Sequence, residues 1–172
     1  MKVTTLTNGN LYMNGTSRAG TVDSIKLPDL MQKTQDLMPL GMIGTHQVPT
    51  GFETFELTMQ VSAYNDEFMR AVCNPYVSTN LQVRGEIQEH NANGTTTTRA
   101  YACMITGRAK GVTLGEFKAQ ELVKQEVTFI CSAIEMKIDN VEQFAINLLT
   151  SVHRINGVDV KGNYRNTLGL NP

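Results

Sequence analysis

The side chains that could carry out chemistry are scattered along this 172-residue sequence. The three histidines, His46, His90 and His153, lie in different segments. None has another histidine, a cysteine or a carboxylate at a spacing typical of metal ligands, such as i, i+4 on a helix. The pattern predicts ordinary surface or interface histidines and neither a metal site nor a cofactor.

The cysteines and one glycine-rich stretch carry no catalytic signature. Cys73, Cys103 and Cys131 are far apart and odd in number, which favours reduced thiols over a disulfide framework. None has the flanking residues of a known nucleophile, and Cys103 and Cys131 fall in runs that resemble buried strands. The glycines from Gly107 to Gly115 fit neither a dinucleotide-binding nor a P-loop spacing. The sequence therefore predicts a protein that is not an enzyme.

The charge balance excludes a strong attraction to polyanions. Fifteen basic and sixteen acidic residues give a net charge of −1, so no overall basic field would hold nucleic acid. Neighbouring strand positions such as Arg84 and Glu86 alternate in sign. This pattern favours either a solvated strand face with cross-strand pairs, or a face lining a wide channel that does not grip DNA.

Length and hydropathy bound the class of protein. The chain is long enough for one domain, 1–172, with a core of its own. No run of 18 apolar residues and no secretory apolar segment is present, so we expect no membrane span.

Long runs with a period of two predict most of the structure. In Phe55–Ser62, apolar Phe55, Leu57, Met59 and Val61 alternate with polar residues, as in a half-buried strand. Four longer runs lie at Leu81–His90, Thr95–Thr106, Leu122–Ile138 and Phe144–Ile155. Asn93-Gly94 between the first two predicts a hairpin. Such strands exceed the usual length of about 5–6 residues and favour an elongated sheet shared with neighbours.

One helix is predicted at 65–73. Asn65 is a suitable N-cap, Asp66 and Glu67 favour the positive end of the helix dipole, and Asn74-Pro75 ends the helix. Its apolar stripe, Phe68, Met69 and Val72, would pack on the sheet.

The remaining segments give weaker signals. We expect a short strand at Leu11–Met13 between two Asn-Gly turns, and a strand at Thr21–Leu27 that ends at Pro28. Leu30–Met38 reads as extended or irregular, and Gly107–Gln120 as a connection. Asn156-Gly157 begins a polar C-terminal segment with another turn.

The loop from Pro39 to Gly51 combines glycines and prolines with apolar side chains. Leu40, Met42, Ile43 and Val48 are unusual for a surface loop. Either the loop folds over its own core, or it docks on another subunit.

Four stretches, taken in order, resemble the major tail tube proteins of contractile-tailed bacteriophages. They are the Leu-Pro element in Val22–Leu30, the Gly41–Gly44 loop leading into Phe55–Thr58, the basic connection from Gly107 through Lys118, and Val152–Leu170. Two features depart from that family. Asp139-Asn140 stands where the family often has Asp-Gly, and Cys131-Ser-Ala133 replaces aromatic residues.

The resemblance implies a mainly β fold, a β-barrel or sandwich of long antiparallel strands with one short flanking α-helix. It implies a single tail-tube domain over 1–172, with an inter-ring loop at 39–51, the helix at 65–73 and a C-terminal segment at 156–172. Six subunits would form a ring, and rings would stack into a hollow tube. Leu40, Met42, Ile43 and Val48 would be the anchors of the stacking loop.

The resemblance also implies partners and a location. The partners would be further copies of the chain, a tail sheath protein, the baseplate initiator and the tail terminator. Double-stranded DNA would pass through the lumen without specific binding. The tube would belong to the virion tail and assemble in the host bacterial cytoplasm. Two alternatives are the inner tube of a contractile bacteriocin or secretion system, and a monomeric ligand-binding β-barrel.

Overall fold

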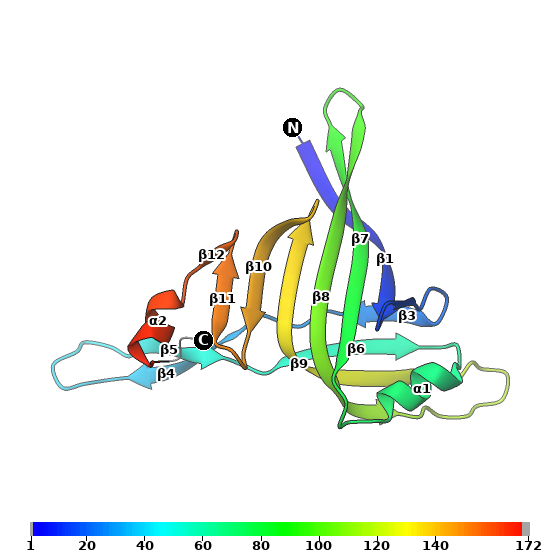
Figure 1. The fold of residues 1–172 in the computed structure, drawn as a ribbon, viewed down its shortest axis with the longest axis horizontal. Helices are drawn as coiled ribbons and strands as arrows, with labels where there is room; N and C mark the ends of the chain where they lie inside the picture. The colour runs from blue at the N-terminus through cyan, green and yellow to red at the C-terminus, as the bar shows by residue number, and fades with distance from the viewer. Residues whose placement is uncertain (1, 170–172) are drawn as a thin grey trace.

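The computed structural model describes residues 2–169, which form antiparallel strands and two short helices (Figure 1). None of the described helices is long and apolar enough to cross a membrane. In chain order, the elements are β1 Lys2–Met13, β2 Thr16–Ser17, β3 Val22–Lys26, β4 Gln32–Leu37, β5 His46–Phe52, β6 Phe55–Val61, α1 Asp66–Val72, β7 Thr79–Asn91, β8 Thr96–Thr113, β9 Gln125–Ile138, β10 Val141–Asn147, β11 Val152–Ile155, β12 Val158–Asp159 and α2 Gly162–Thr167.

Ten of the strands form one sheet, in the order β12-β11-β10-β9-β8-β7-β1-β2, with β6 pairing with β9 and β3 with β6. The long strands β8 and β9 belong to two layers of this sheet. The first half of β9 pairs with β6, and the second half pairs with β10. In Figure 1, β6 and β3 run crosswise to the upper parts of β7 and β8. The sheet therefore folds over on itself, and β8 and β9 each run without a break from one layer into the other.

A glycine sits where β8 passes from one layer to the other. The register between β8 and β9 shifts at this point, because Thr106 faces Ala133 while Gly107 faces Cys131. A Cβ on Gly107 would lie 2.7 Å from the carbonyl oxygen of Ile130. Such a contact is far inside normal packing distances, so the close approach of the two backbones requires glycine here.

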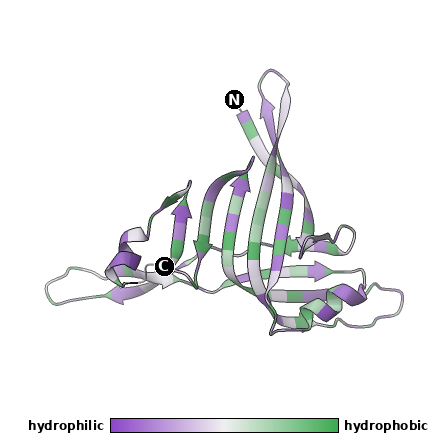
Figure 2. Cartoon of the chain, in the orientation of Figure 1, coloured by the Kyte–Doolittle hydropathy of each residue, from purple (hydrophilic) through white to green (hydrophobic). Residues whose placement is uncertain are grey.

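The core lies between the two layers and is closed by α1. Phe55, Leu57 and Met59 of β6 are fully buried, as the alternation in the sequence predicted. Phe129 of β9 and Phe68 of α1 are buried in the same cluster. Figure 2 shows the corresponding alternation of hydrophobic and hydrophilic residues along the strands. Burying this alternating face is the main apolar contribution to folding.

The helix and the hairpin predicted from local signals are confirmed. The side-chain oxygen of Asn65 accepts a hydrogen bond from the N–H of Phe68 at 3.0 Å, as expected of an N-cap. Asn93-Gly94 lies in the turn between β7 and β8, where Gly94 has a φ of +79°. A left-handed residue at this position closes the hairpin without strain.

The expectation of a mainly β fold is confirmed, but within residues 2–169 the sheet does not close into a barrel. β3 pairs with β6 alone, and a hollow of about 350 Å³ lined by residues such as Leu11 and Val22 separates it from β1. A closed barrel that holds a ligand, one of the alternatives from the sequence, is therefore not seen in the described residues.

Two strands are longer than expected. Asn8-Gly9 was predicted to be a turn, but it is a bulge inside β1, with a register shift between Thr7 and Gly9 and a φ of 52° at Asn8. Gly107–Thr113 was predicted to be a connection, but it continues β8 and pairs with β9. Both predictions were wrong because an Asn-Gly pair or a run of glycines marks bulges and close backbone contacts as well as turns.

Other segments are divided into strands and turns differently from what the sequence predicted. Phe144–Ile155 was expected as one strand, but a turn at 148–151 separates β10 from β11. Leu30–Met38 contains β4, and half of the loop predicted at 39–51 is β5. The C-terminal segment includes α2, which was not predicted. Residues 170–172, at the end of that segment, lie outside the described residues, as does Met1.

Candidate assembly surfaces

The hairpin β4–β5 projects away from the two-layer body (Figure 1). Its strands pair with one another from Gln32–Phe52 at the base to Leu37–His46 near the tip, and they form a separate two-stranded sheet. Every residue of β4 is exposed. An isolated two-stranded hairpin is marginally stable in water. The hairpin is therefore a surface that would gain stability from contact with another molecule.

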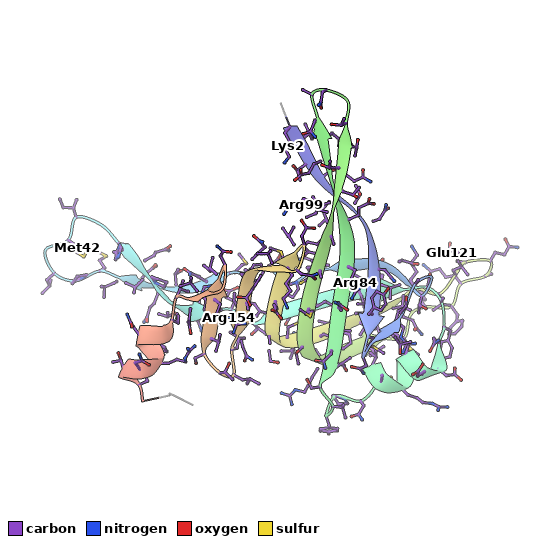
Figure 3. The ribbon with its side chains drawn as sticks, turned by 45° about the horizontal axis from the view of Figure 1, so that its top comes forward. Lys2, Met42, Arg84, Arg99, Glu121 and Arg154 are labelled. Carbon is purple, nitrogen blue, oxygen red and sulfur yellow. The ribbon has the colours of Figure 1, made fainter. Side chains whose placement is uncertain are left out.

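The tip of this hairpin, residues 38–45, is apolar and exposed. Leu40 and Ile43 are fully exposed, and Met42, which is 45% exposed, lies at the far end of the hairpin (Figure 3). Val48 is partly exposed and lies on β5 rather than in the loop. The structure thus places all four predicted residues on one hairpin. The alternative that this loop folds over its own core is wrong, because these side chains contact no core.

A groove opens where β8 and β9 pass between the two layers, next to the base of the hairpin. Its volume is about 650 Å³. We call it the outer groove. Its larger side chains come from Phe52, Tyr76, Arg108, Ile130, Leu148 and Leu149, and smaller or polar residues such as Glu53, Ser78 and Ser132 complete its lining. Tyr76 is 89% exposed and Leu149 82% exposed. Sequence reasoning missed this site because its residues come from separate strands and loops that meet only in the folded chain.

The face of the main sheet that points away from the core is polar and carries both signs of charge. Glu135 and Lys137 alternate along β9 with core residues and pair with each other at 2.9 Å. Arg154 of β11 donates two hydrogen bonds to Glu142 of β10, at 3.2 and 2.9 Å. This contact lowers the pKa of the Glu142 carboxyl below its ordinary value. Arg154 and Glu142 thus form a cross-strand pair, and Glu135 and Lys137 a pair along one strand. Arg84, named from the sequence, instead lies over the Tyr12 ring, 5.2 Å from its centroid.

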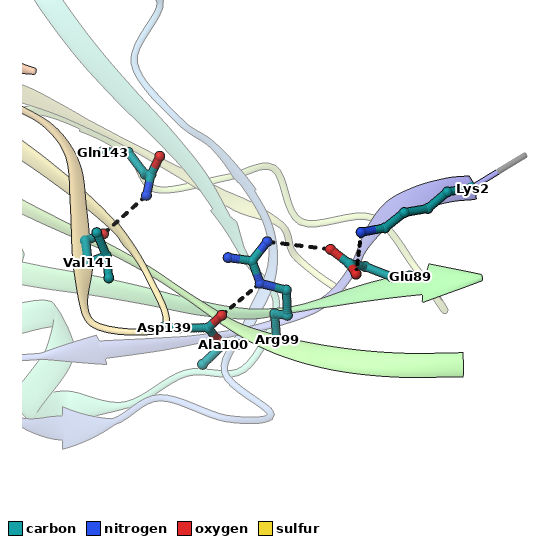
Figure 4. Close-up of polar contacts among 7 residues, drawn as sticks. All are labelled: Lys2, Glu89, Arg99, Ala100, Asp139, Val141 and Gln143. Carbon is teal, nitrogen blue, oxygen red and sulfur yellow. Dashed lines mark hydrogen bonds and ion pairs between the residues drawn. The ribbon is translucent and has the colours of Figure 1, made fainter. Parts of the chain in front are cut away.

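The ends of β1, β7 and β8 extend beyond the body as an arm, and a chain of ion pairs along the arm joins it to the turn between β9 and β10 (Figure 4). Glu89 accepts contacts from Lys2 at 2.6 Å and from Arg99 at 3.4 Å. Arg99 also contacts Asp139, in the turn between β9 and β10, at 2.6 Å. The second Asp139 oxygen accepts the N–H of Ala100 at 2.9 Å.

The turn that supplies Asp139 is one of the two departures from the resembled family. Asp139 and Asn140 have φ values of 51° and 64°, so both residues are left-handed. Two such residues form the tight hairpin turn that Asp-Gly would also form. The departure therefore leaves the hairpin between β9 and β10 intact.

This network predicts a dependence of stability on pH. The Arg99 guanidinium and the Ala100 N–H lower the pKa of Asp139 below the ordinary aspartate value of 3.8. A depressed pKa adds stability that is present above the unfolded pKa and is lost as the pH falls through the folded pKa. We expect Asp139→Asn, which keeps a residue that tolerates the turn, to lower the denaturation midpoint at pH 7. The difference from the unaltered protein should vanish well below pH 3.8.

Urea denaturation of both proteins at a series of pH values would measure this effect. The variant Arg99→Met removes the same contact from the other side, together with the Arg99–Glu89 contact, and should lower the midpoint at pH 7 by at least as much. An equal difference at pH 7 and at pH 2.5 would show that the Asp139 charge contributes nothing to stability.

No cluster of three potential metal ligands occurs among residues 2–169. The histidines lie apart on β5, β7 and β11, and His153 packs edge-on against Phe52. Cys103 and Cys131 are buried, and burial raises the pKa of each thiol to about 11. Such thiols are poor nucleophiles at neutral pH.

Comparison with known proteins agrees with a surface built for assembly. A family model described as phage tail tube protein FII matches residues 3–169. The tail tube protein of Escherichia phage P2 is 26% identical over 168 residues, which cover 94% of each chain.

Two solved structures share the fold. The sheath-tube complex of an extracellular contractile injection system has a TM-score of 0.55 at 13% identity, over 75% of this chain and 87% of that chain. The sheath/tube terminator of the same kind of system has a TM-score of 0.53 at 12% identity, over 75% of this chain and 92% of that chain.

Proposed function

We propose, from the premise that this chain belongs to the phage tail tube protein FII family, that its copies join edge to edge into rings that stack into a hollow tube. A tail tube protein is a structural component, and the chain is not an enzyme. We take 1–172 as one tail-tube domain of the virion tail, which assembles in the cytoplasm of the host bacterium.

Sheet edges support the side-by-side contact. Along most of β1, only β7 pairs with it, and β12 ends the other side of the sheet. Unpaired edges expose N–H and C=O groups, and pairing with an adjacent copy satisfies them. Six copies, the number that the family resemblance implies, would then form a closed ring in which these two edges are paired.

The hairpin β4–β5 is the observation that carries the stacking contact. It projects past the β11–β12 side of the body (Figure 1), and its tip carries two fully exposed apolar side chains, Leu40 and Ile43. Monomeric proteins rarely leave such a tip uncovered. We propose that Leu40, Met42, Ile43 and Val48 dock on a copy in the adjoining ring.

A conduit for double-stranded DNA fits the charge of the chain. The net charge is −1, and Lys137 and Arg154 on the polar face of the main sheet are each paired with a carboxylate. Neither of these basic groups is free to bind phosphates. A wall of this kind lets DNA pass without specific binding.

The remaining partners follow from the kind of tail. The two structures of similar fold are named as a sheath-tube complex and a sheath/tube terminator. We propose a contractile sheath around this tube, a baseplate initiator at one end and a terminator at the other.

The fold also favours a second candidate, since both structural relatives belong to an extracellular contractile injection system. The inner tube of a contractile bacteriocin or secretion system would use the same subunit contacts without a genome. Electron microscopy of particles containing this protein separates the two, since only phage particles carry a DNA-filled capsid.

Electron microscopy of Ile43→Asp tests the tube and its docking tip together. We expect rings or hollow tubes from the unaltered protein at high concentration. The variant should lose tubes but keep its thermal unfolding midpoint, because a fully exposed side chain contributes little to the fold.

The control Ile43→Leu keeps an apolar side chain and should form tubes. Normal tubes from Ile43→Asp would rule out the docking role. Absence of rings and tubes from the unaltered protein, even when seeded with tube fragments, would contradict the proposed function itself.

A further inference from the structure

We infer that the outer groove of one copy is the acceptor for the hairpin tip of another copy. This inference rests on the proposed function, because it names the surface on which the tip docks. Both surfaces carry exposed apolar side chains, and both belong to the same chain.

The tip of a hairpin cannot reach the groove of its own chain. Phe52 lines the groove and also forms the base of the hairpin, where it pairs with Gln32. The seven residues of β5 span roughly 20 Å at about 3.3 Å per residue, so the tip is held well away. Only a second copy can place its tip in the groove.

The chemistry of the two surfaces matches. The tip offers Leu40 and Ile43, while the groove offers Tyr76 and Leu149 as its most exposed apolar side chains. Burying apolar side chains on both partners favours association.

The backbone at the groove rim is already satisfied. The side-chain oxygen of Asn147 accepts the N–H groups of Leu149 at 3.0 Å and Thr150 at 3.1 Å. Covering the rim with an apolar tip therefore leaves neither of these donors without a partner, and avoids the desolvation cost of an unmade hydrogen bond.

Charge is complementary beside the apolar contact. Asp36 stands near the end of β4, next to the tip, and the groove is lined by one basic residue, Arg108, and one acidic residue, Glu53, close to the base of the hairpin. Asp36 and Arg108 are exposed, and among the ion pairs of residues 2–169 neither has a partner. A carboxylate arriving with the tip would pair with this guanidinium and fix the direction of docking.

The contact joins two different surfaces, the tip of one copy and the groove of another. It therefore does not end with a closed dimer and can be repeated from copy to copy. Each copy would use its tip on one neighbour and its groove on another. Such a head-to-tail contact builds an open stack, which is what a tube requires.

Disulfide trapping in assembled tubes tests this contact. The parent is Cys73→Ser, because Cys73 is the exposed cysteine among three free ones. In this parent, Ile43→Cys combined with Leu149→Cys should give a ladder of covalently linked copies on mild oxidation. The control pair combines Ile43→Cys with Leu122→Cys, which is 81% exposed. Leu122 neighbours Glu121, at the opposite end of the molecule from Met42 (Figure 3), and should give no ladder.

A charge exchange gives a second readout. Asp36→Arg and Arg108→Asp should each raise the concentration needed for tube growth by about fivefold or more, and the double variant should restore it. Tubes that form normally but give no 43–149 ladder would overturn the groove assignment and leave the tube function standing. A ladder and a restored double variant would establish it.

Discussion

Replacing Leu57 by Ala is expected to lower the free energy of unfolding by about 2–5 kcal/mol. Leu57 is fully buried, and it faces Phe129 across the β6–β9 pair. β6 and the first half of β9 form one layer, and α1 and the other layer of the sheet leave little room for the surroundings to collapse into a cavity. Denaturant unfolding of the subunit, at a concentration below that of assembly, measures the difference.

A leucine on the surface provides the control. Leu122→Ala removes the same atoms from a side chain that is 81% exposed, and should change the free energy by no more than about 0.5 kcal/mol. If Leu57→Ala behaved like this control, the apolar face of β6 would not be part of the core.

Adding a single methyl group at the bend of β8 is expected to have a comparable effect. Gly107→Ala places a Cβ 2.7 Å from the Ile130 carbonyl oxygen and 3.2 Å from the Cys131 Cα, both of them backbone atoms. Backbone cannot move aside as a side chain can, so β8 and β9 must separate where they pass between layers. Overpacking of this kind costs about 1–3 kcal/mol.

Gly111→Ala in the same strand is the matched control. A Cβ at Gly111 meets nothing within 4 Å. Its alanine variant should be neutral or slightly stabilising, by about 0.5 kcal/mol, because it reduces the entropy of the unfolded chain. Gly107→Ala should therefore lower the denaturation midpoint, and Gly111→Ala should not. Equal midpoints for the two variants would show that the layers do not approach closely at Gly107.

Local patterns predicted the parts of the fold that depend on local physics. The period-two run of β6 and the Asn65 cap of α1 are confirmed because burial of one strand face and capping of one helix act within a few residues. The helix α2 gave no such signal. Its N-cap, Lys161, makes no side-chain capping hydrogen bond, and none of its residues is buried.

Contacts between distant segments could not be predicted in the same way. The sequence identified the apolar side chains of the 39–51 segment but left open whether they covered their own core, since residue types are the same in both cases. In the structure, β4 pairs with β5 in a projecting hairpin, and this pairing keeps the apolar side chains away from the core. The outer groove draws Tyr76, Arg108 and Leu149 from three separate segments. No spacing within one segment marks such a site.

The place of β9 in the chain has a consequence for synthesis. β9 pairs with β6, β8 and β10, yet it is made long after β6. At roughly 5–20 residues per second, the apolar face of β6 stays uncovered for several seconds on the ribosome. The β11–β12 edge, which we propose joins the next subunit in the ring, is made later still. A truncated product would therefore lack both its folded core and one of its two joining edges, so that only chains translated nearly to the end could enter the tube.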